Sequence, residues 1–298
     1  MQKRILTRTA LVCLGILGAT GVAAAQAQET MMTPAKVVFI AREDVKPGKA
    51  SAHEKVEASW ARAFSQAKTD NHYIGVTSMT GPNVALFFEI YDSLADWEKQ
   101  NRAIESNASL TAQIDPIAEK DGELLTETRG SLAIFEPDLS YNTTTAPVKG
   151  TRYFLILMQR VKPGHGEQYE AVRKAILAAH QKANVQEHYA VYHVIMGAQS
   201  GTYLTFVPIK SLGELDQYAQ IHGKPYHEAL GKDGEKLIEE FDREGLAASE
   251  VNLYALSPKL SYAPKEWIAA DTEFWAPKPK PVAKPAAMKK EAAKPAGQ

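Results

Sequence analysis

Hydrophobic and polar positions along this chain follow two blocks with the same order of patterns. In the first block, short β-rich or alternating apolar runs predict strands, and apolar residues at helical spacing predict helices. The predicted strands cover residues 36–42, 73–79, 84–91 and 130–135, and the predicted helices cover 50–68, a stretch starting at 94, and 109–123. In the first helix we expect Val56, Trp60, Phe64 and Ala67 to form the buried stripe.

The second block repeats this order. Its predicted strands cover residues 153–161, 189–196, 202–208 and 251–256, and its predicted helices cover 167–183, a stretch after Ser211, and 224–244. Each block therefore reads strand, helix, strand, strand, helix, strand. This order builds a four-stranded antiparallel sheet with its helices on one face.

Short sequences recur between the blocks. Val-Lys-Pro-Gly at 45–48 returns 116 positions later at 161–164, and Leu-Ser-Tyr at 139–141 returns 121 positions later at 260–262. A repeat of this length has the size of a small domain, so the pattern predicts two similar units around a pseudo-twofold axis.

Both faces of the hairpin strands carry apolar residues. In the first block Leu86 and Phe88 alternate with Ala85 and Phe87. One set is expected to meet the helices and the other to meet the sheet of the sister unit. The predicted fold class is α+β, with two tandem ferredoxin-like βαββαβ units packed sheet to sheet.

This element order, together with the repeated Val-Lys-Pro-Gly and glycine-turn positions, resembles the dimeric α+β barrel superfamily. That superfamily includes antibiotic-biosynthesis monooxygenases, NIPSNAP-type and EthD-type proteins. The resemblance covers residues 36–262 and implies a barrel closed within one chain. Its members include cofactor-free oxygenases, haem proteins, isomerases and ligand-sensing domains, so the fold leaves the activity open.

The chain begins with a secretory signal pattern. Lys3, Arg4 and Arg8 precede an apolar stretch at 10–25, and a small-x-small cleavage signal follows at 25–27. We expect cleavage after about Ala27 and a periplasmic or secreted bacterial protein. The only cysteine, Cys13, lies within the leader, which excludes disulfides and thiolate chemistry from the mature chain.

Charge is distributed unevenly along the rest of the chain. The full chain has a net charge of −1, but residues 1–27 carry +3 and residues 277–298, with six lysines and one glutamate, carry +5, which leaves about −9 on residues 28–276. An acidic body argues against nucleic acid as a partner. The Lys/Pro/Ala tail is predicted to be a disordered spacer, or alternatively to make weak contact with an anionic envelope surface. The predicted segments are a signal peptide at 1–27, a first unit at 36–141, a linker at 142–151, a second unit at 152–262, a docking arm at 263–276 and the tail at 277–298.

Strong catalytic motifs are absent from the sequence, so the two copies serve as controls for each other. Positions that agree, such as His72 and His188, are interpreted as structural. Positions where one copy has gained a reactive side chain are candidate site residues. His180 stands at the place of Phe64, His193 at Thr77, Tyr192 at Val76, Tyr203 at Ala85, and Glu89 at the place of Val207.

We interpret His180, His193 and Glu89 as candidate catalytic residues and Tyr192 and Tyr203 as candidate ligand-binding residues. The alternative is structural: the histidines are packing residues, the tyrosines are ordinary sheet residues, and Glu89 lies at a solvent-exposed strand edge. No metal site is expected, because the histidine pairs His188/His193 and His222/His227 lack ligand spacing.

Three functions remain open at this point. The first is an exported protein that binds a small apolar or aromatic molecule in a pocket of the second unit, with no cofactor. The second, implied by the resemblance, is a cofactor-independent oxygenase or a haem-binding enzyme. The third is a non-catalytic envelope interaction protein. Whether the protein is an enzyme, and its oligomeric state, are left open by the sequence.

Overall fold

The computed structural model describes residues 29–276, except for the side chains of residues 218 and 219. The predicted signal peptide and the Lys/Pro/Ala tail lie outside these residues. Among the described helices, none combines the length and the apolar character needed to cross a membrane.

The first unit contains four strands and three helices in the predicted order. They are β1 (Val37–Val45), α1 (Ala50–Ala67), β2 (Tyr73–Ser78), β3 (Val84–Tyr91), α2 (Leu94–Glu105), α3 (Ala108–Gly122) and β4 (Leu125–Phe135), followed by the short η1 (Pro137–Leu139). Strand β4 starts earlier than predicted, because its polar first half lies in the sheet beside β1.

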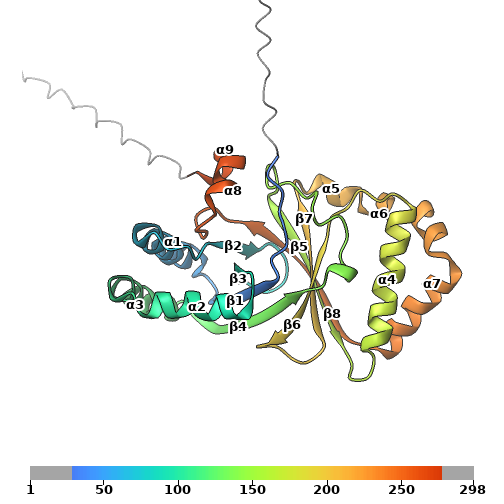
Figure 1. Ribbon diagram of the computed structural model, residues 1–298, viewed down its shortest axis with the longest axis horizontal. Coiled ribbons are helices and arrows are strands. Elements are labelled where there is room, and N and C mark those ends of the chain that lie inside the picture. The colour runs from blue at the N-terminus through green and yellow to red at the C-terminus, as the bar shows by residue number, and fades with distance from the viewer. Residues whose placement is uncertain (1–28, 277–298) are drawn as a thin grey trace, which may run out of the picture.

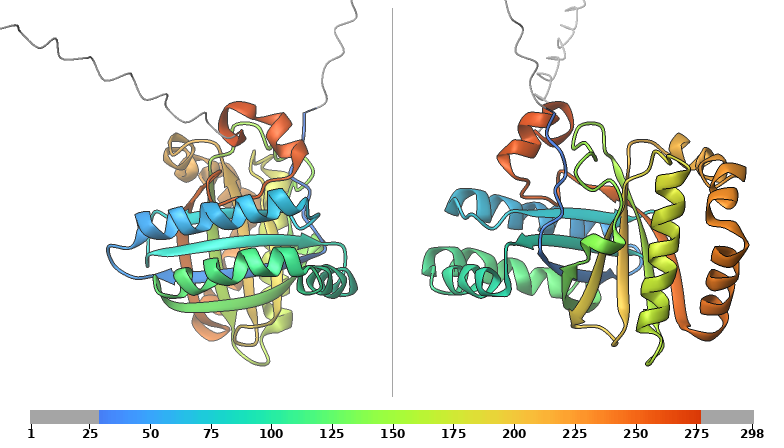
Figure 2. Two further views of the ribbon diagram at one scale, coloured as in Figure 1. Left: turned by 90° about the vertical axis from the view of Figure 1, so that its left-hand side faces the viewer. Right: turned by 45° about the vertical axis from the view of Figure 1, so that its right-hand side comes forward.

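The second unit has the same plan. Its elements are β5 (Tyr153–Val161), α4 (Gly166–Lys182), β6 (Ala190–Met196), β7 (Thr202–Ile209), α5 (Gly213–Asp216), α6 (Tyr218–Ile221), α7 (Lys224–Glu244) and β8 (Leu246–Leu256). Two short helices follow, α8 (Lys265–Ala270) and α9 (Thr272–Trp275). They lie over one end of the barrel, beside the segment that leads into β1 (Figures 1 and 2).

The two sheets join into one closed antiparallel barrel with the order β1-β3-β2-β8-β5-β7-β6-β4. Pairing of β2 with β8 and of β4 with β6 closes the barrel between the units. The helices of the two units lie outside the barrel on opposite sides (Figure 1). This arrangement confirms the predicted α+β fold of tandem ferredoxin-like units.

Strand alternation divides the apolar residues into an inner core and two outer layers. Leu86 and Phe88 belong to the core inside the barrel, whereas Ala85 and Phe87 pack with Phe64 of helix α1. In the second unit Phe206 packs inside the barrel and Val207 packs beneath the helices. The two faces therefore separate as the sequence predicted.

The repeated Val-Lys-Pro-Gly segment forms the same turn in both units. Gly48 and Gly164 have φ values of +76° and +87°, a region that glycine enters without steric penalty. Lys46 Nζ donates to the carbonyl oxygen of Glu123 at 2.7 Å, and Lys162 Nζ donates to that of Glu244 at 2.9 Å. In each unit the lysine thus places a positive charge at the C-terminal end of the last long helix.

The repeated Leu-Ser-Tyr segments cross between the units. Ser140 Oγ accepts a hydrogen bond from the amide of Val191 in β6, and Ser261 Oγ accepts one from Gly75 in β2, both at 2.9 Å. Each segment therefore leaves its own unit and packs on a strand of the other. The exchange is reciprocal, as expected of a pseudo-twofold pair.

Candidate functional site

An aromatic partition crosses the inside of the barrel. Phe88 and Phe206 occupy equivalent positions in β3 and β7, and their rings meet edge to face with centroids 5.3 Å apart. Phe154 of β5 completes the group, with centroids 6.4 Å from Phe88 and 6.2 Å from Phe206. Both Phe88 and Phe206 line a cavity on each side of the partition.

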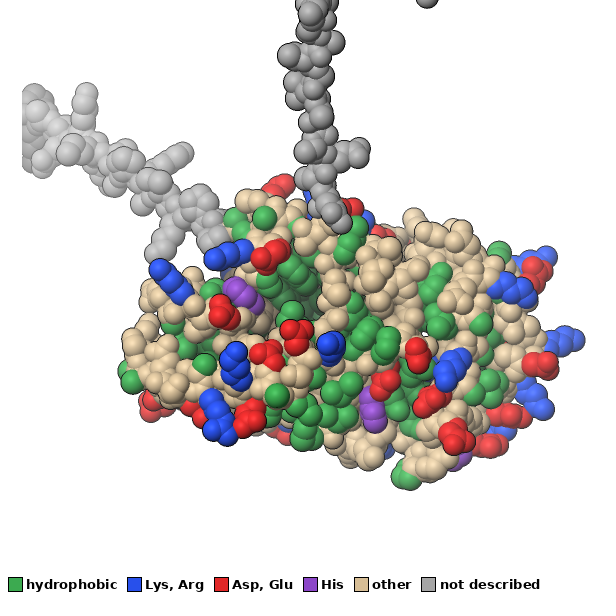
Figure 3. All heavy atoms as spheres, in the orientation of Figure 1, with side chains coloured by type: hydrophobic (Ala, Val, Ile, Leu, Met, Phe, Trp, Pro, Cys, Tyr) green, Lys and Arg blue, Asp and Glu red, His purple; other side chains and the backbone are tan. Residues whose placement is uncertain are grey.

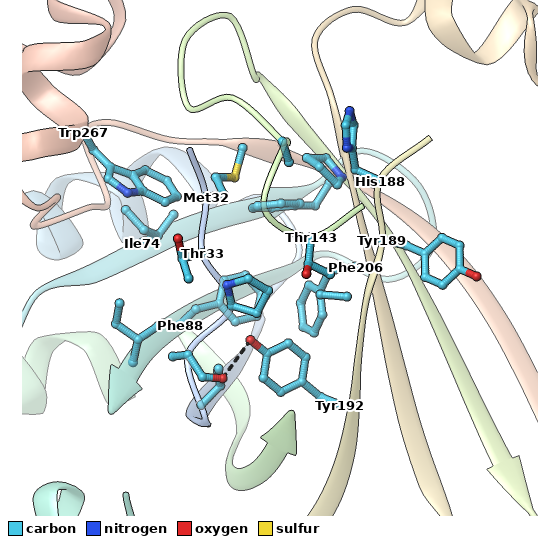
Figure 4. A pocket seen from close by; sticks show the side chains of 18 of the residues that line it. Met32, Thr33, Ile74, Phe88, Thr143, His188, Tyr189, Tyr192, Phe206 and Trp267 are labelled. Carbon is cyan, nitrogen blue, oxygen red and sulfur yellow. Dashed lines mark hydrogen bonds between the residues drawn. The ribbon is translucent and has the colours of Figure 1, made fainter. Parts of the chain in front are cut away.

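The cavity beneath α8, here called the arm cavity, has a volume of about 170 Å³. Its walls are mostly apolar and include Ile74, Phe88 and Phe206 from the barrel and Met32 and Trp267 from segments outside the strands (Figure 4). Figure 3 shows a hollow bordered by hydrophobic side chains between the α8–α9 region and the segment that enters β1. The arm cavity thus lies where the two units and their flanking segments meet.

Two histidines at equivalent positions, His72 and His188, line the arm cavity. His72 Nδ1 lies 3.1 Å from the carbonyl oxygen of Tyr262, and His188 Nδ1 lies 3.0 Å from that of Asn142. A carbonyl can only accept, so each Nδ1 is assigned the proton, which leaves Nε2 of a neutral ring as an acceptor. These hydrogen bonds agree with a structural role for both histidines. Their rings also form part of the wall of the arm cavity.

The second cavity, here called the open chamber, lies on the other side of the partition and has a volume of about 750 Å³. Apolar side chains such as Ile40 and Leu204 line this chamber, together with charged residues. Arg42 pairs with Asp44 at 2.8 Å, and the Arg129 guanidinium contacts Glu127 at 2.5 Å. A third arginine, Arg160, contacts the side-chain oxygen of Gln199, so the lining of this chamber contains three arginines and one acid, Glu250.

Among the candidate ligand-binding residues, Tyr192 faces the inside of the barrel. Its ring lines the arm cavity beside Phe206, and its hydroxyl donates to the carbonyl oxygen of Ala35 at 3.2 Å (Figure 4). This hydrogen bond ties the segment before β1 to the second unit. Burial raises the pKa of the Tyr192 hydroxyl above its usual value, so the group stays protonated.

His193 and Tyr203 face the helices instead. Their rings stack with centroids 4.5 Å apart and an interplanar angle of 13°, and the Tyr203 ring also contacts that of Tyr169 of α4, tilted by 34° with centroids 4.2 Å apart. Because Tyr192 and His193 are neighbours on one strand, they point to opposite faces. The structure therefore does not bring Tyr192, His193 and Tyr203 into one pocket.

His180 lies on α4 with 3% of its surface exposed. Its Nε2 lies 3.1 Å from Nε2 of His222 and 3.7 Å from Oε2 of Glu187, and its Nδ1 lies 3.3 Å from the Tyr189 hydroxyl. Burial lowers the pKa of the His180 imidazole to about 4, so the ring is neutral at pH 7. Tyr189 separates this group from the arm cavity, since its ring points away from the cavity (Figure 4).

Glu89 lies in the first unit, away from the other candidates. It accepts a hydrogen bond from the Tyr91 hydroxyl, and burial raises the pKa of its carboxyl group. Neither cavity includes Glu89, His180 or His193 among its lining residues. Their proposed catalytic role therefore stays a prediction.

Two groups of described side chains could hold a metal ion, although histidine spacing predicted none. The first contains His180, Glu187 and His222. The second, here called the acid cluster, contains Glu43, His53, Glu57 and Asp121. Spacing along the chain could not reveal either group, because the members come from different elements. Glu57 and His53 carried the only local signal, an i, i+4 pair on one helix face.

The predicted apolar stripe of α1 is therefore wrong in part. The buried residues of this helix are His53, Glu57, Ala63 and Phe64, so only Phe64 of the expected set is fully buried. The helix turns two polar residues toward the sheet because Glu43 of β1 and Asp121 of α3 meet them there. Apolar periodicity cannot register a buried face of this kind.

No protein-family model matches the chain, and no curated protein matches its sequence. Among solved structures, an anthrone oxidase-like protein superposes with a TM-score of 0.50 at 13% identity, covering 76% of this chain and 94% of that chain. This chain has the dimeric α+β barrel fold.

Two other structures with this dimeric α+β barrel fold superpose less closely. An uncharacterized NIPSNAP domain protein from Burkholderia xenovorans gives a TM-score of 0.29 at 13% identity, covering 34% of this chain and 95% of that chain. The chlorite dismutase from Candidatus Nitrospira defluvii gives 0.44 at 12% identity, covering 76% and 93%. Likeness at these identities concerns the fold alone.

Proposed function

We propose that this dimeric α+β barrel protein binds a compact aromatic or apolar molecule in the arm cavity. The observation that carries the proposal is an apolar cavity of about 170 Å³ walled by Phe88, Phe206, Tyr192 and Trp267. Apolar cavities of about 150 Å³ stay dry and take up benzene. The arm cavity thus has room for a single six-membered ring.

The two histidines favour a ligand that carries one hydrogen-bond donor. With Nδ1 of His72 and His188 held by carbonyl oxygens, the ring nitrogen left in each is an acceptor. A phenol or an aromatic amine meets this requirement better than a carboxylate, which has no proton to donate. The proposed ligand class is therefore a small phenol-like molecule rather than an organic anion.

The affinity of such a ligand follows from its size. Burial of six ring carbons at about 0.8 kcal/mol each gives about 5 kcal/mol, which corresponds to a Kd on the order of 0.1–1 mM. Binding at this strength is measurable by calorimetry and raises Tm at millimolar ligand.

The test uses phenol and toluene with two matched alanine substitutions. Ala190 lines the arm cavity and Ala248 lines the open chamber. We expect Ala190→Leu to fill the arm cavity and abolish binding of both probes, and Ala248→Leu to leave it unchanged. Loss of binding in Ala248→Leu alone, or no binding of either probe to the wild type, would overturn the proposal.

We propose binding rather than turnover because the arm cavity contains neither His180, His193 nor Glu89. The oxygenase and haem alternatives predict different results from the same sample. Oxygen consumption with phenolic probes would support the oxygenase, and a Soret band after addition of hemin would support the haem protein. Absence of both, with phenol bound at the arm cavity, is the expected result.

A further inference from the structure

The acid cluster lies in the space between the sheet of the first unit and its helices. Glu43 comes from β1, His53 and Glu57 from α1, and Asp121 from α3, and one donor atom of each lies within 4.8 Å of the others. The exposed fractions of the side chains are 16% for Glu43, 3% for His53, 4% for Glu57 and 7% for Asp121. The cluster therefore converges from three elements in a place shielded from water.

The donor atoms surround one imidazole nitrogen. His53 Nε2 lies 2.8 Å from Glu43 Oε2, 3.6 Å from Asp121 Oδ1 and 4.0 Å from Glu57 Oε1. Ligand atoms around a four-coordinate cation with bonds of about 2.1 Å lie about 3.4 Å apart. The three distances from His53 Nε2 lie within about 0.6 Å of this value, and all four ligand atoms lie within 4.8 Å of one another, so rearrangement of the side chains alone could bring them to coordination distances.

The cluster has more negative charge than its neighbours can balance. Glu57 Oε1 and Asp121 Oδ1, two of the atoms that face His53, are buried and accept no hydrogen bond from any described residue. Two buried oxygen atoms that face His53 are therefore left without a hydrogen-bond donor among the described residues.

In the second unit, a positively charged residue stands at one of the positions equivalent to the acid cluster. The 116-residue offset sets Tyr169 at the position of His53 and Arg173 at the position of Glu57. The Arg173 guanidinium is buried and lies 5.0 Å from the centre of the Tyr189 ring. A positively charged side chain thus occupies the space beneath α4. Beneath α1, no arginine or lysine belongs to the acid cluster.

We propose that Glu43, His53, Glu57 and Asp121 bind one divalent transition-metal cation, of the Mn²⁺ or Zn²⁺ class, as a structural site. An imidazole nitrogen with three carboxylates suits these ions better than Ca²⁺, which takes six to eight oxygen ligands. The four protein ligands line neither the arm cavity nor the open chamber, as is typical of a structural site closed to substrate. The cation would tie β1, α1 and α3 together, and the site is independent of the arm cavity.

Asp121 and its counterpart Asp242 provide a matched test, because the 121-residue offset relates their positions in the two units. The purified full chain is treated with EDTA, dialysed and titrated with MnCl₂ or ZnCl₂ by calorimetry, and bound metal is counted by mass spectrometry. We expect one equivalent and a rise in Tm for the wild type and for Asp242→Asn. In Asp121→Asn we expect Kd to weaken by about 100-fold or more, beyond the effect of an outer-sphere change.

Two further measurements keep the result unambiguous. Glu57→Gln preserves the shape of the side chain and should also lose the metal, whereas His180→Phe, which alters the His180–Glu187–His222 group, should keep it. Metal lost in His180→Phe but retained in Glu57→Gln would overturn the proposal, because the ion would then lie in the second unit. A chelated wild type that binds neither ion, or Asp121→Asn that binds as tightly as the wild type, would overturn it as well.

Discussion

In the first unit, the space between the sheet and the helices holds three carboxylates around His53, whereas in the second unit the corresponding space holds Arg173 and Tyr169. The two spaces lie on opposite sides of the molecule and do not share residues (Figure 1). Each can therefore change its charge without affecting the other. Duplication has in this way allowed the two outer layers to diverge while the fold is kept.

The inside of the barrel is different, because the two units meet there. Phe88 and Phe206 are equivalent residues that contact each other across the pseudo-twofold axis, and a change in one alters the surroundings of the other. The Leu-Ser-Tyr segments are under the same constraint, since each binds a strand of the opposite unit. The shared phenylalanines and Leu-Ser-Tyr segments thus lie at contacts between the units, whereas the divergent residues of the acid cluster lie beneath the helices of one unit.

The largest expected difference between the units concerns the hairpin glycines Gly81 and Gly197, with φ values of +73° and +84°. A Cβ at Gly197 would collide with the backbone carbonyl of Gly130, whereas one at Gly81 would meet the side chain of Asn252, which can rotate. We expect Gly197→Ala to lower the free energy of unfolding by about 3 kcal/mol and Gly81→Ala by about 1 kcal/mol. Urea denaturation of both variants measures this, and equal losses would show that the two turns are equivalent.

The next largest effect is a pH dependence found in the second unit alone. The pKa of His180 is lowered to about 4, so below pH 6.5 the unfolded chain binds a proton that the folded chain does not. The wild type should lose about 3 kcal/mol of stability between pH 6.5 and pH 4 from this group. Its charged and titratable neighbours include Tyr141, Arg173, Glu187, Tyr189, His222 and Tyr226.

His180→Phe introduces the residue found at the equivalent position, Phe64, and should remove this part of the pH dependence. The measurement is the free energy of unfolding at several pH values for both proteins. The variant is expected to be less stable than the wild type at pH 7, because the Tyr189 hydroxyl loses its partner. The difference between their free energies of unfolding should shrink as pH falls. Curves that stay parallel from pH 7 to pH 4 would contradict the assignment.

How far the sequence predicts the molecule depends on the layer considered. The bounds of α7, Lys224–Glu244, match the prediction, although Gly231 with φ +68° interrupts the helix, and strand β3 runs over Val84–Tyr91 as its apolar pattern predicts. The buried face of α1 was mispredicted because His53 and Glu57 are polar residues at core positions. Such residues are buried only when partners from other elements meet them, and a single helix does not encode those partners.

The arm cavity was beyond prediction for a different reason. Met32, Thr143 and Trp267 come from segments before, between and after the units, where the sequence has no periodicity to place them. Comparison of the copies did identify Tyr192, which lines the cavity, and His180, which does not. The same comparison assigned His72 and His188 a structural role because both copies have them, yet both line the arm cavity. A site on a pseudo-twofold axis takes equivalent residues from both units, so agreement between the copies does not exclude a residue from the site.

A smaller effect is expected from the tyrosine hydroxyls that cross between the units. Tyr141 donates to the carbonyl oxygen of Val185 at 3.0 Å in a buried setting, and Tyr262 donates to that of Thr69 at 3.1 Å in a partly exposed one. Tyr141→Phe should cost about 1.5 kcal/mol, because the buried carbonyl loses its donor, and Tyr262→Phe about 0.5 kcal/mol, because water can replace it. A larger loss in Tyr262→Phe, measured by urea denaturation, would reverse this ranking.

The smallest expected loss of stability follows replacement of Lys46 or Lys162, and it should be equal in the two units. Lys46 and Lys162 bind the C-terminal carbonyl groups of α3 and α7 through exposed ammonium groups, so both interactions are screened by salt. Lys46→Met and Lys162→Met keep most of the aliphatic stem and should each cost about 0.5 kcal/mol at low ionic strength and less in 1 M NaCl. The double variant should show the sum, because the sites belong to different units and share no partner. Unequal costs would mean that divergence beneath the helices extends to the repeated Val-Lys-Pro-Gly turn, which the two copies share residue for residue.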